Sequence, residues 1–194
     1  MIRFHLHAAR RRAVSAMLGA AVLAAIALPA VAMAADGEPT TSVVPTCNGK
    51  AATIVGLPGQ SAIRGTQGAD VIVGLSGDVR IDGRGGDDTI CAGSGSNIIN
   101  GGAGNDWIDA GDGANTVDGG AGNDAIIAGP GNDVLLGGTG NDDVSAGDGD
   151  NLVSTGSGDD DIATGSGSDR IDGGKDYDLC QSGTGTDWVN HCEG

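Results

Sequence analysis

Residues 101–109 read GGAGNDWID and residues 119–127 read GGAGNDAII, so the same six letters return two nonads later. The nonad between them, AGDGANTVD, keeps the arrangement but has Ala for the first Gly and Asn for the Asp. The chain therefore has a nonad period and a stronger period of twice that length. This predicts a repeat architecture in which two nonads form one coil, and like nonads stack on like.

The nonad frame runs from Gly65 to Asn190 without an insertion or deletion and contains fourteen nonads, or seven coils. The fourth letter is Gly in every nonad except one, which has Asp176, and the eighth is aliphatic in every nonad except one, which has Cys180. Ile54 and Ile63 extend the aliphatic column upstream. A flexible glycine-rich linker has no reason to keep such a phase. We expect a short strand in each nonad, with one inward side chain.

The sixth letters form two series. In alternate nonads they are Asp70, Asp88, Asp106, Asp124, Asp142, Asp160 and Asp178. In the intervening nonads they are Val79, Asn97, Asn115, Asp133, Asn151, Asp169 and Asp187. If two nonads make one coil, each series stacks along one side of the fold. We call these sides the aspartate flank and the mixed flank.

The pattern resembles the RTX (repeats-in-toxin) nonapeptide, G-G-x-G-x-D-x-U-x with U aliphatic, over residues 65–190. The resemblance implies an all-β fold, a parallel β-roll (a β-solenoid) with two nonads per coil, in which GGAGND at 101–106 is a turn and WID at 107–109 a strand. It also implies several Ca²⁺ ions, each held between position-six aspartates of stacked turns and by loop carbonyls.

Elementary electrostatics agrees with a cation on the aspartate flank. Carboxylates one strand spacing apart repel each other by about 1 kcal/mol in water and by more near the protein. Calcium accepts six to eight oxygen ligands, including carboxylates and carbonyls, whereas magnesium prefers a tight octahedron. The predicted metal ligands are Asp70, Asp88, Asp106, Asp124, Asp142, Asp160 and Asp178, which define six gaps, and Asp133, Asp169 and Asp187 on the mixed flank. Asp176 replaces a turn glycine beside the last gap, 160/178, and puts that gap in doubt.

The mixed flank departs from the repeat. Val79 offers no side-chain ligand, and Asn97, Asn115 and Asn151 offer only a neutral amide oxygen. Stacked Asn side chains can hydrogen-bond as a ladder without an ion. We expect weak or no calcium binding over most of this flank and a possible site at the 169/187 gap.

The N-terminus resembles a secretory leader. Residues 1–12 carry four basic side chains, an apolar run follows, and Ala32 and Ala34 suit a cleavage site after residue 34. An N-terminal membrane anchor is the alternative, and Sec and twin-arginine export both stay open. The expected organisation is a signal peptide (1–34), a short disordered segment (35–46), a cap with degenerate repeats (47–64), the roll (65–190) and a C-terminal cap (191–194). The protein is predicted to be secreted and extracellular, with no membrane span after cleavage.

Charge and motif content restrict the function. Beyond residue 34 the chain has six basic residues against 26 acidic ones, a balance that repels nucleic acid and attracts cations. His191 is the only histidine there, and the chain contains no phosphate-binding, EF-hand or HExxH motif. We predict a protein that is not an enzyme. The alternative is an adhesin or surface-recognition module with a cell-surface or glycan partner, using Trp107 and Trp188 as an outward contact patch; a hydrolase is a third hypothesis.

Four cysteines in an exported chain indicate disulfides, with three possible pairings. A Cys180–Cys192 bond would tie the tail across the end of the roll, which leaves Cys47 with Cys91. Strict register separates Cys47 from Cys91 by about two coils, roughly 10 Å, which exceeds the usual Cα separation of a disulfide, about 7 Å. Either the N-terminal cap leaves the register or this pairing is wrong.

Overall fold

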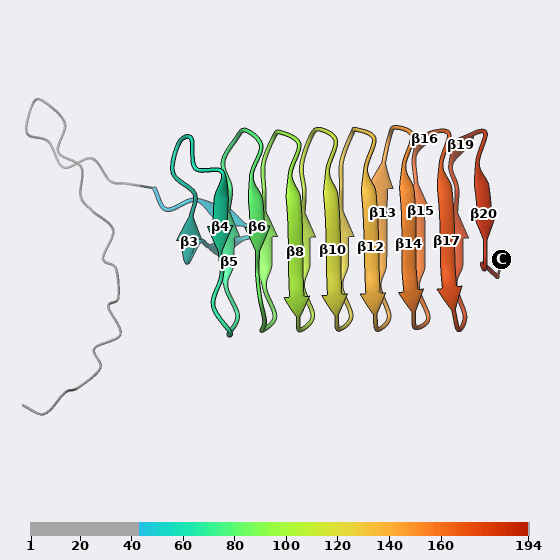
Figure 1. The fold of residues 1–194 in the computed structure, drawn as a ribbon, viewed down its shortest axis with the longest axis horizontal. Helices are drawn as coiled ribbons and strands as arrows, with labels where there is room; N and C mark the ends of the chain where they lie inside the picture. The colour runs from blue at the N-terminus through green and yellow to red at the C-terminus, as the bar shows by residue number, and fades with distance from the viewer. Residues whose placement is uncertain (1–42, 194) are drawn as a thin grey trace, which may run out of the picture. The chain divides into compact units, whose positions relative to one another are not determined.

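The computed structural model describes residues 43–193, which contain strands and turns but no helix, and hence no helix able to cross a membrane. The predicted leader and most of the predicted segment 35–46 lie outside the described residues. Two parallel sheets of eight strands each lie face to face, and successive strands of the chain alternate between them (Figure 1). The predicted all-β parallel roll is confirmed.

We call the two sheets sheet 1 and sheet 2. Sheet 1 contains β3 (Ile54–Val55), β5 (Val71–Val73), β7 (Thr89–Cys91), β9 (Trp107–Asp109), β11 (Ala125–Ile127), β13 (Asp143–Gly147), β15 (Asp161–Thr164) and β18 (Leu179–Gln181). Sheet 2 contains β4 (Ala62–Arg64), β6 (Arg80–Asp82), β8 (Ile98–Ala103), β10 (Thr116–Ala121), β12 (Val134–Thr139), β14 (Leu152–Ser157), β17 (Arg170–Lys175) and β20 (Trp188–Asn190).

Neighbouring strands in each sheet are offset by two nonads. Ile108 is paired with Ile126 in sheet 1, and Val117 with Leu135 in sheet 2. The degenerate upstream nonads keep the same register, because Ile54 pairs with Ile72 and Ile63 with Ile81, and they bring each sheet to eight strands. The turns of alternate nonads therefore stack on two opposite edges of the roll, as the sequence series predict (Figure 1).

The core is a double column of position-eight side chains, one column from each sheet. From Ile72 to Ile171 these side chains are almost completely buried. Valine and isoleucine suit this pleated surface because their branched side chains pack well against the side chains of neighbouring strands. Val189, in the last strand, is exposed because no further strand follows β20 among the described residues.

A second buried set was not anticipated. Most mixed nonads carry alanine at position one, and these methyl groups join the core: Ala92, Ala110, Ala128 and Ala146. Position one of the aspartate nonads is glycine in all but one case, Thr155. The two flanks therefore differ at position one as well as at position six.

Within the N-terminal cap, only the hairpin over residues 46–51 leaves the register. β1 (Thr46–Cys47) and β2 (Lys50–Ala51) form an antiparallel hairpin beside β5 and β7. The hairpin covers outward-facing residues of sheet 1, where Lys50 Nζ donates to Thr89 Oγ1 at 2.9 Å. Cys47 thereby reaches Cys91, with a Cα–Cα distance of 5.7 Å. This pairing is therefore present, and the conflict with strict register is resolved by the displaced hairpin.

The second disulfide, Cys180–Cys192, joins β18 to the tail that follows β20, with a Cα–Cα distance of 5.8 Å. In the last two turns of the mixed flank, β16 (Ser166–Gly167) and β19 (Thr184–Gly185) form a small parallel sheet. Asp176, which replaces a turn glycine, adopts a φ of 77° and so preserves the turn. Asp tolerates this left-handed conformation better than most residues do.

Candidate metal centre

Every position-six carboxylate of the aspartate flank points into the gap between its turn and a neighbouring turn. These side chains are buried, although they are polar: Asp70, Asp88, Asp106, Asp124, Asp142, Asp160 and Asp178. One carboxylate oxygen of each, Oδ1, faces the preceding coil. The backbone N–H of Asp88, for example, donates to Asp106 Oδ1 at 2.8 Å, and the N–H of Asp106 donates to Asp124 Oδ1 at 2.8 Å. The aspartates thus form a hydrogen-bonded ladder along the flank.

The second oxygen, Oδ2, is buried and has no hydrogen-bond partner among residues 43–193 in eight of the position-six aspartates. These atoms, which we call the open oxygens, belong to Asp88, Asp106, Asp124, Asp133, Asp142, Asp160, Asp169 and Asp178. Burying a polar atom without a partner costs about 1–3 kcal/mol, and more for a charge. Eight such costs in one small fold indicate that a proton, a cation or an ordered water satisfies these oxygens.

The glycine at position one shows what surrounds an open oxygen. A Cβ built on Gly83 would lie 2.5 Å from Asp88 Oδ2 and 2.5 Å from the carbonyl oxygen of Gly101, in the next coil. A Cβ on Gly119 would lie 2.5 Å from Asp124 Oδ2 and 2.7 Å from the carbonyl oxygen of Gly137. Two electronegative atoms from successive coils therefore converge on the same space. Glycine leaves that space open in every aspartate nonad except the one that begins with Thr155. The space suits a hard cation, which carboxylates and carbonyls bind together.

Asparagine on the mixed flank provides an internal comparison. Asn97 Oδ1 accepts the N–H of Val79, as an aspartate would. Its Nδ2 occupies the place of an open oxygen and donates to the carbonyl oxygens of Gly93, Gly95 and Ala110 at 3.1, 3.2 and 3.0 Å.

Asn115 repeats this arrangement with Gly111, Gly113 and Ala128, and Asn151 with Gly147 and Gly149. Asparagine thus carries its own positive pole toward converging carbonyls. An aspartate at the same place presents an oxygen to those carbonyls, and a proton or a cation would remove the resulting repulsion.

The mixed flank also has three aspartates at position six, which are Asp133, Asp169 and Asp187. Asp133 and Asp169 retain open oxygens, and their Oδ1 atoms accept the N–H groups of Asn115 and Asn151. Asp187 is partly buried, and its Oδ1 accepts the N–H of Asp169 at 3.0 Å. The 169/187 gap therefore has carboxylates on both sides, as expected, and the 133/151 gap is a second place on this flank with an open oxygen.

Asp70 differs from the other six aspartates of its flank. Its Oδ2 accepts the backbone N–H of Thr66 at 2.7 Å and the Thr66 hydroxyl at 3.0 Å. The Thr53 hydroxyl reaches its Oδ1 at 3.5 Å. Its carboxylate is therefore already partnered by hydrogen-bond donors. The signal in the sequence is Thr66 itself, which stands at position two, where the repeat has glycine.

Burial shifts the acidity of the stacked carboxyl groups. The pKa of Asp106 is raised to about 7: desolvation by burial is the largest cause, the Asp88 N–H lowers the pKa, and the charges of Asp124 and Asp88 raise it. The pKa of Asp142 is likewise raised to about 7 and that of Asp88 to about 6, chiefly by burial. Burial also raises the pKa of Asp124, Asp133 and Asp178. Without a cation, Asp106 and Asp142 are partly protonated at neutral pH.

Carboxylates, imidazoles and thiols do not gather in groups of three or more anywhere in residues 43–193. The oxygens available at each gap are one or two carboxylates together with backbone carbonyls. This is a ligand set for Ca²⁺, which accepts carbonyl oxygens in flexible geometry.

The two tryptophans do not form one patch. Trp107 lies on β9 of sheet 1 and Trp188 on β20 of sheet 2, so the contact patch that the surface-recognition alternative invoked is not formed by these two residues. The sequence contained the signal, because the residues belong to nonads of different series. Trp188 instead stacks with Arg170, whose guanidinium carbon lies 4.9 Å from the ring centroid.

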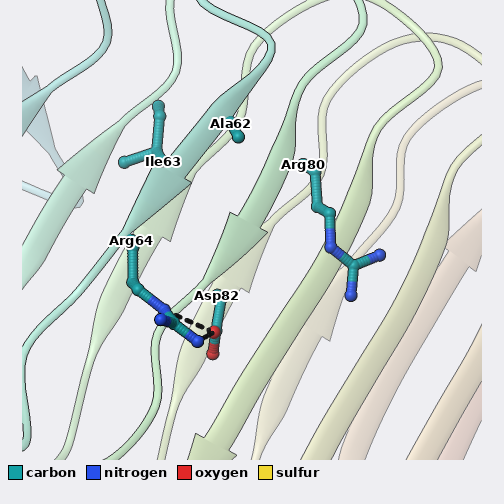
Figure 2. A pocket seen from close by; sticks show the side chains of 5 residues that line it. All are labelled: Ala62, Ile63, Arg64, Arg80 and Asp82. Carbon is teal, nitrogen blue, oxygen red and sulfur yellow. Dashed lines mark hydrogen bonds and ion pairs between the residues drawn. The ribbon is translucent and has the colours of Figure 1, made fainter.

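A shallow hollow lies on the outer face of sheet 2, near the N-terminal end (Figure 2). Its lining includes Arg64, Arg80 and Asp82. Arg64 turns toward Asp82 and pairs with it at 3.0 Å, whereas Arg80 extends away from them (Figure 2). The single carboxylate of this hollow is therefore already paired, and the hollow lies on strands rather than in the gaps between turns.

Comparison with protein families agrees with this geometry. The profile of the RTX calcium-binding nonapeptide repeat (4 copies) matches five overlapping stretches, residues 64–99, 92–126, 118–153, 127–162 and 154–189. No curated protein gives a significant match over the chain. The matched stretches cover nearly all of the roll, and the chain belongs to the family of RTX calcium-binding nonapeptide repeat proteins.

Proposed function

We propose that this calcium-binding repeat protein is exported and holds its ions at the open oxygens, so that ion binding and folding are coupled. On the aspartate flank the proposed ligands are Asp88, Asp106, Asp124, Asp142, Asp160 and Asp178. On the mixed flank they are Asp133 and Asp169, with Asp187 across the last gap. Asp70 is not among the proposed ligands, because Thr66 already satisfies its Oδ2.

The observation that supports this assignment is the series of buried open oxygens beside carbonyl oxygens of the next coil. The thin aliphatic core cannot absorb the cost of so many buried charges, since burying one Ile or Val contributes about 1.5–3 kcal/mol. Divalent cations bound between turns would turn this repulsion into attraction. Because the turns are separate in the unfolded chain, the free energy of binding becomes free energy of folding.

Export is supported by the leader-like N-terminus and by two disulfides, which form and persist in oxidising compartments. Extracellular calcium modules commonly bind at about 10⁻⁴–10⁻³ M. A site of that affinity is empty inside a cell and filled outside, so the chain would fold after export. We propose a non-catalytic role.

The direct test uses circular dichroism of residues 35–194, with both disulfides intact, in calcium and in a chelator. We expect strand signal in calcium, its loss in the chelator at neutral pH and its return when calcium is added back. Magnesium at the same concentration is the matched control, and we expect it to restore little signal. Equal strand signal with and without calcium would contradict the proposal.

A second candidate function, surface recognition, is favoured by the outer face of sheet 2. Several large apolar side chains are exposed there: Ile98, Leu136, Leu152 and Trp188. A rod held rigid by calcium could present these side chains to a glycan or cell surface. Calcium-dependent retention on cell-wall polysaccharide that is lost in Trp188→Ala and kept in Trp107→Ala would support this function. Equal retention of Trp188→Ala and the wild type would count against it.

A further inference from the structure

Asp178 is the last position-six aspartate of its flank. No further strand follows β18 in sheet 1 among the described residues, yet Asp178 is fully buried and retains an open oxygen. An aspartate at the end of a stack should be exposed on its outer side. Its burial therefore requires that another segment cover it.

The tail after β20 covers Asp178 and reproduces the atoms of one more turn. In the preceding coil, the N–H of Asp160 donates to Asp178 Oδ1 at 3.1 Å. At the C-terminal end of the roll, the N–H of Asp178 donates in the same way to Glu193 Oε2 at 2.8 Å. In the coil below, the N–H of Leu179 donates to the Asp160 carbonyl at 2.9 Å, and at the end the N–H of Glu193 donates to the Asp178 carbonyl at 2.7 Å.

The carbonyl beside the open oxygen is reproduced as well. A Cβ built on Gly173 would meet the carbonyl oxygen of His191 and would lie 2.7 Å from Asp178 Oδ2. Above Gly83 the same two places are occupied by the Gly101 carbonyl and Asp88 Oδ2. Residues 191–193 thus supply the carbonyl, the N–H and the carboxylate of a complete turn.

Glu193 performs this role from an irregular position. Asp178 stands 18 positions after Asp160, but Glu193 stands only 15 positions after Asp178. Glu193 therefore occupies position three of its nonad instead of position six. Its side chain, which is longer than that of Asp, reaches the Asp178 N–H from there. Two contacts hold the tail in place. The disulfide to Cys180 joins Cys192, the residue before Glu193, to β18. His191 Nδ1 lies 2.7 Å from Asp172 Oδ1.

We propose that Asp178 Oδ2, the Glu193 carboxylate and the His191 carbonyl form a terminal divalent-cation site, which Glu193 closes in place of a position-six aspartate. The site is distinct from the gaps between repeats because one carboxylate comes from outside the repeat, on a tail tethered by a disulfide. The proposal rests on the proposed function. Glu193 is exposed at the end of the rod, so solvent ions can reach the site.

The test compares calcium stoichiometry, measured by equilibrium dialysis, for the wild type and Glu193→Gln. Glutamine keeps an oxygen that accepts the Asp178 N–H but loses the charge, so a tail that only caps the ladder would tolerate it. We expect Glu193→Gln to bind one Ca²⁺ fewer and to keep its far-ultraviolet spectrum in calcium. Asp143→Asn, which removes one charge from the exposed outer face of sheet 1, is the matched control and should keep the full number.

A second variant tests the tether. Replacing Cys180 and Cys192 by serine frees the tail and should lower the calcium number by the same one ion, while the ions of the repeats remain. If the wild type binds calcium and Glu193→Gln binds the same number with the same affinity, the terminal site is wrong and the proposed function stands. If the wild type binds no calcium, both fail.

Discussion

The aspartate flank and the mixed flank have almost the same backbone and solve the same problem in different ways. On both, position six accepts a backbone N–H from the preceding coil through Oδ1. They differ in the second polar atom, which is an open oxygen in Asp106 and a donor amide in Asn115. The change of one side-chain atom from oxygen to nitrogen therefore separates a turn with an unpartnered buried oxygen from a turn whose hydrogen bonds are complete.

The largest expected effect is on how stability depends on pH in the absence of calcium, because a proton can satisfy a buried carboxylate in place of the cation. The pKa of Asp106 and Asp142 is about 7 in the folded state and that of Asp88 about 6, against an ordinary value of 3.8. Groups with raised folded-state pKa values contribute stability that is fully present below the unfolded value and is lost as pH rises through the folded value. The roll in a chelator should therefore be most stable under acid conditions and should lose stability between about pH 4 and pH 7.

Urea unfolding in a chelator at about pH 5 and about pH 8 measures this effect. In calcium the order should reverse, because ligation requires ionised carboxylates. Chelated protein that becomes more stable as pH rises would contradict the assignment of buried, unpaired carboxylates.

Exchanging the two side chains tests the comparison itself. Asn115→Asp places an oxygen against the carbonyls of Gly111, Gly113 and Ala128. In a chelator this should destabilise the roll by about 1–3 kcal/mol, the cost of a buried unsatisfied group. Asp106→Asn should do the opposite in a chelator and should remove one bound ion in calcium. Isothermal titration calorimetry measures the ion number of both variants, and urea unfolding measures their stability.

Truncation of the same two residues tests the difference between the flanks. Asp106→Ala should also lose an ion and Asn115→Ala should not. Equal losses of bound calcium would refute the difference between the flanks.

Position one offers a second pair of variants. Gly119→Ala places a methyl group against Asp124 Oδ2 and the Gly137 carbonyl, and should cost about 1–3 kcal/mol, as overpacking does, together with one calcium ion. Ala110→Gly removes a buried methyl group on the mixed flank and should cost about 1 kcal/mol without changing the calcium number. An unchanged calcium number in Gly119→Ala would place the ion elsewhere.

The smallest effect is expected at the N-terminal gap. Thr66 already partners Asp70, so Asp70→Asn should leave the calcium number unchanged, whereas Asp88→Asn should lower it by one. Equilibrium dialysis of the two variants under the same conditions compares them. A lost ion in Asp70→Asn would show that the Thr66 contacts are displaced when calcium binds.

Sequence reasoning predicted the features that repeat. The register, the two flanks and the aliphatic core follow from phase, because Ile108 and Ile126 can stack only if two nonads make one coil. Sequence reasoning did not predict features outside the regular repeat, or features that depend on positions one and six of a nonad together. The hairpin at Thr46–Ala51 folds over sheet 1 through contacts that no repeat encodes. Most nonads that begin with Gly have Asp at position six and most that begin with Ala have Asn, with Ala128 before Asp133 and Thr155 before Asp160 among the exceptions. The reason for this tendency becomes visible only in the space beside Gly119.

The disulfide between Cys47 and Cys91 has a consequence for how the rod assembles. It closes a loop with a sequence separation of 44 residues and fixes the first coils beneath the hairpin, whereas the bond at the other end spans only 12. In a linear array, each unit gains its stability mainly from its immediate neighbours. The oxidised N-terminal end thus provides a template, and winding should advance from it toward the C-terminus one coil at a time.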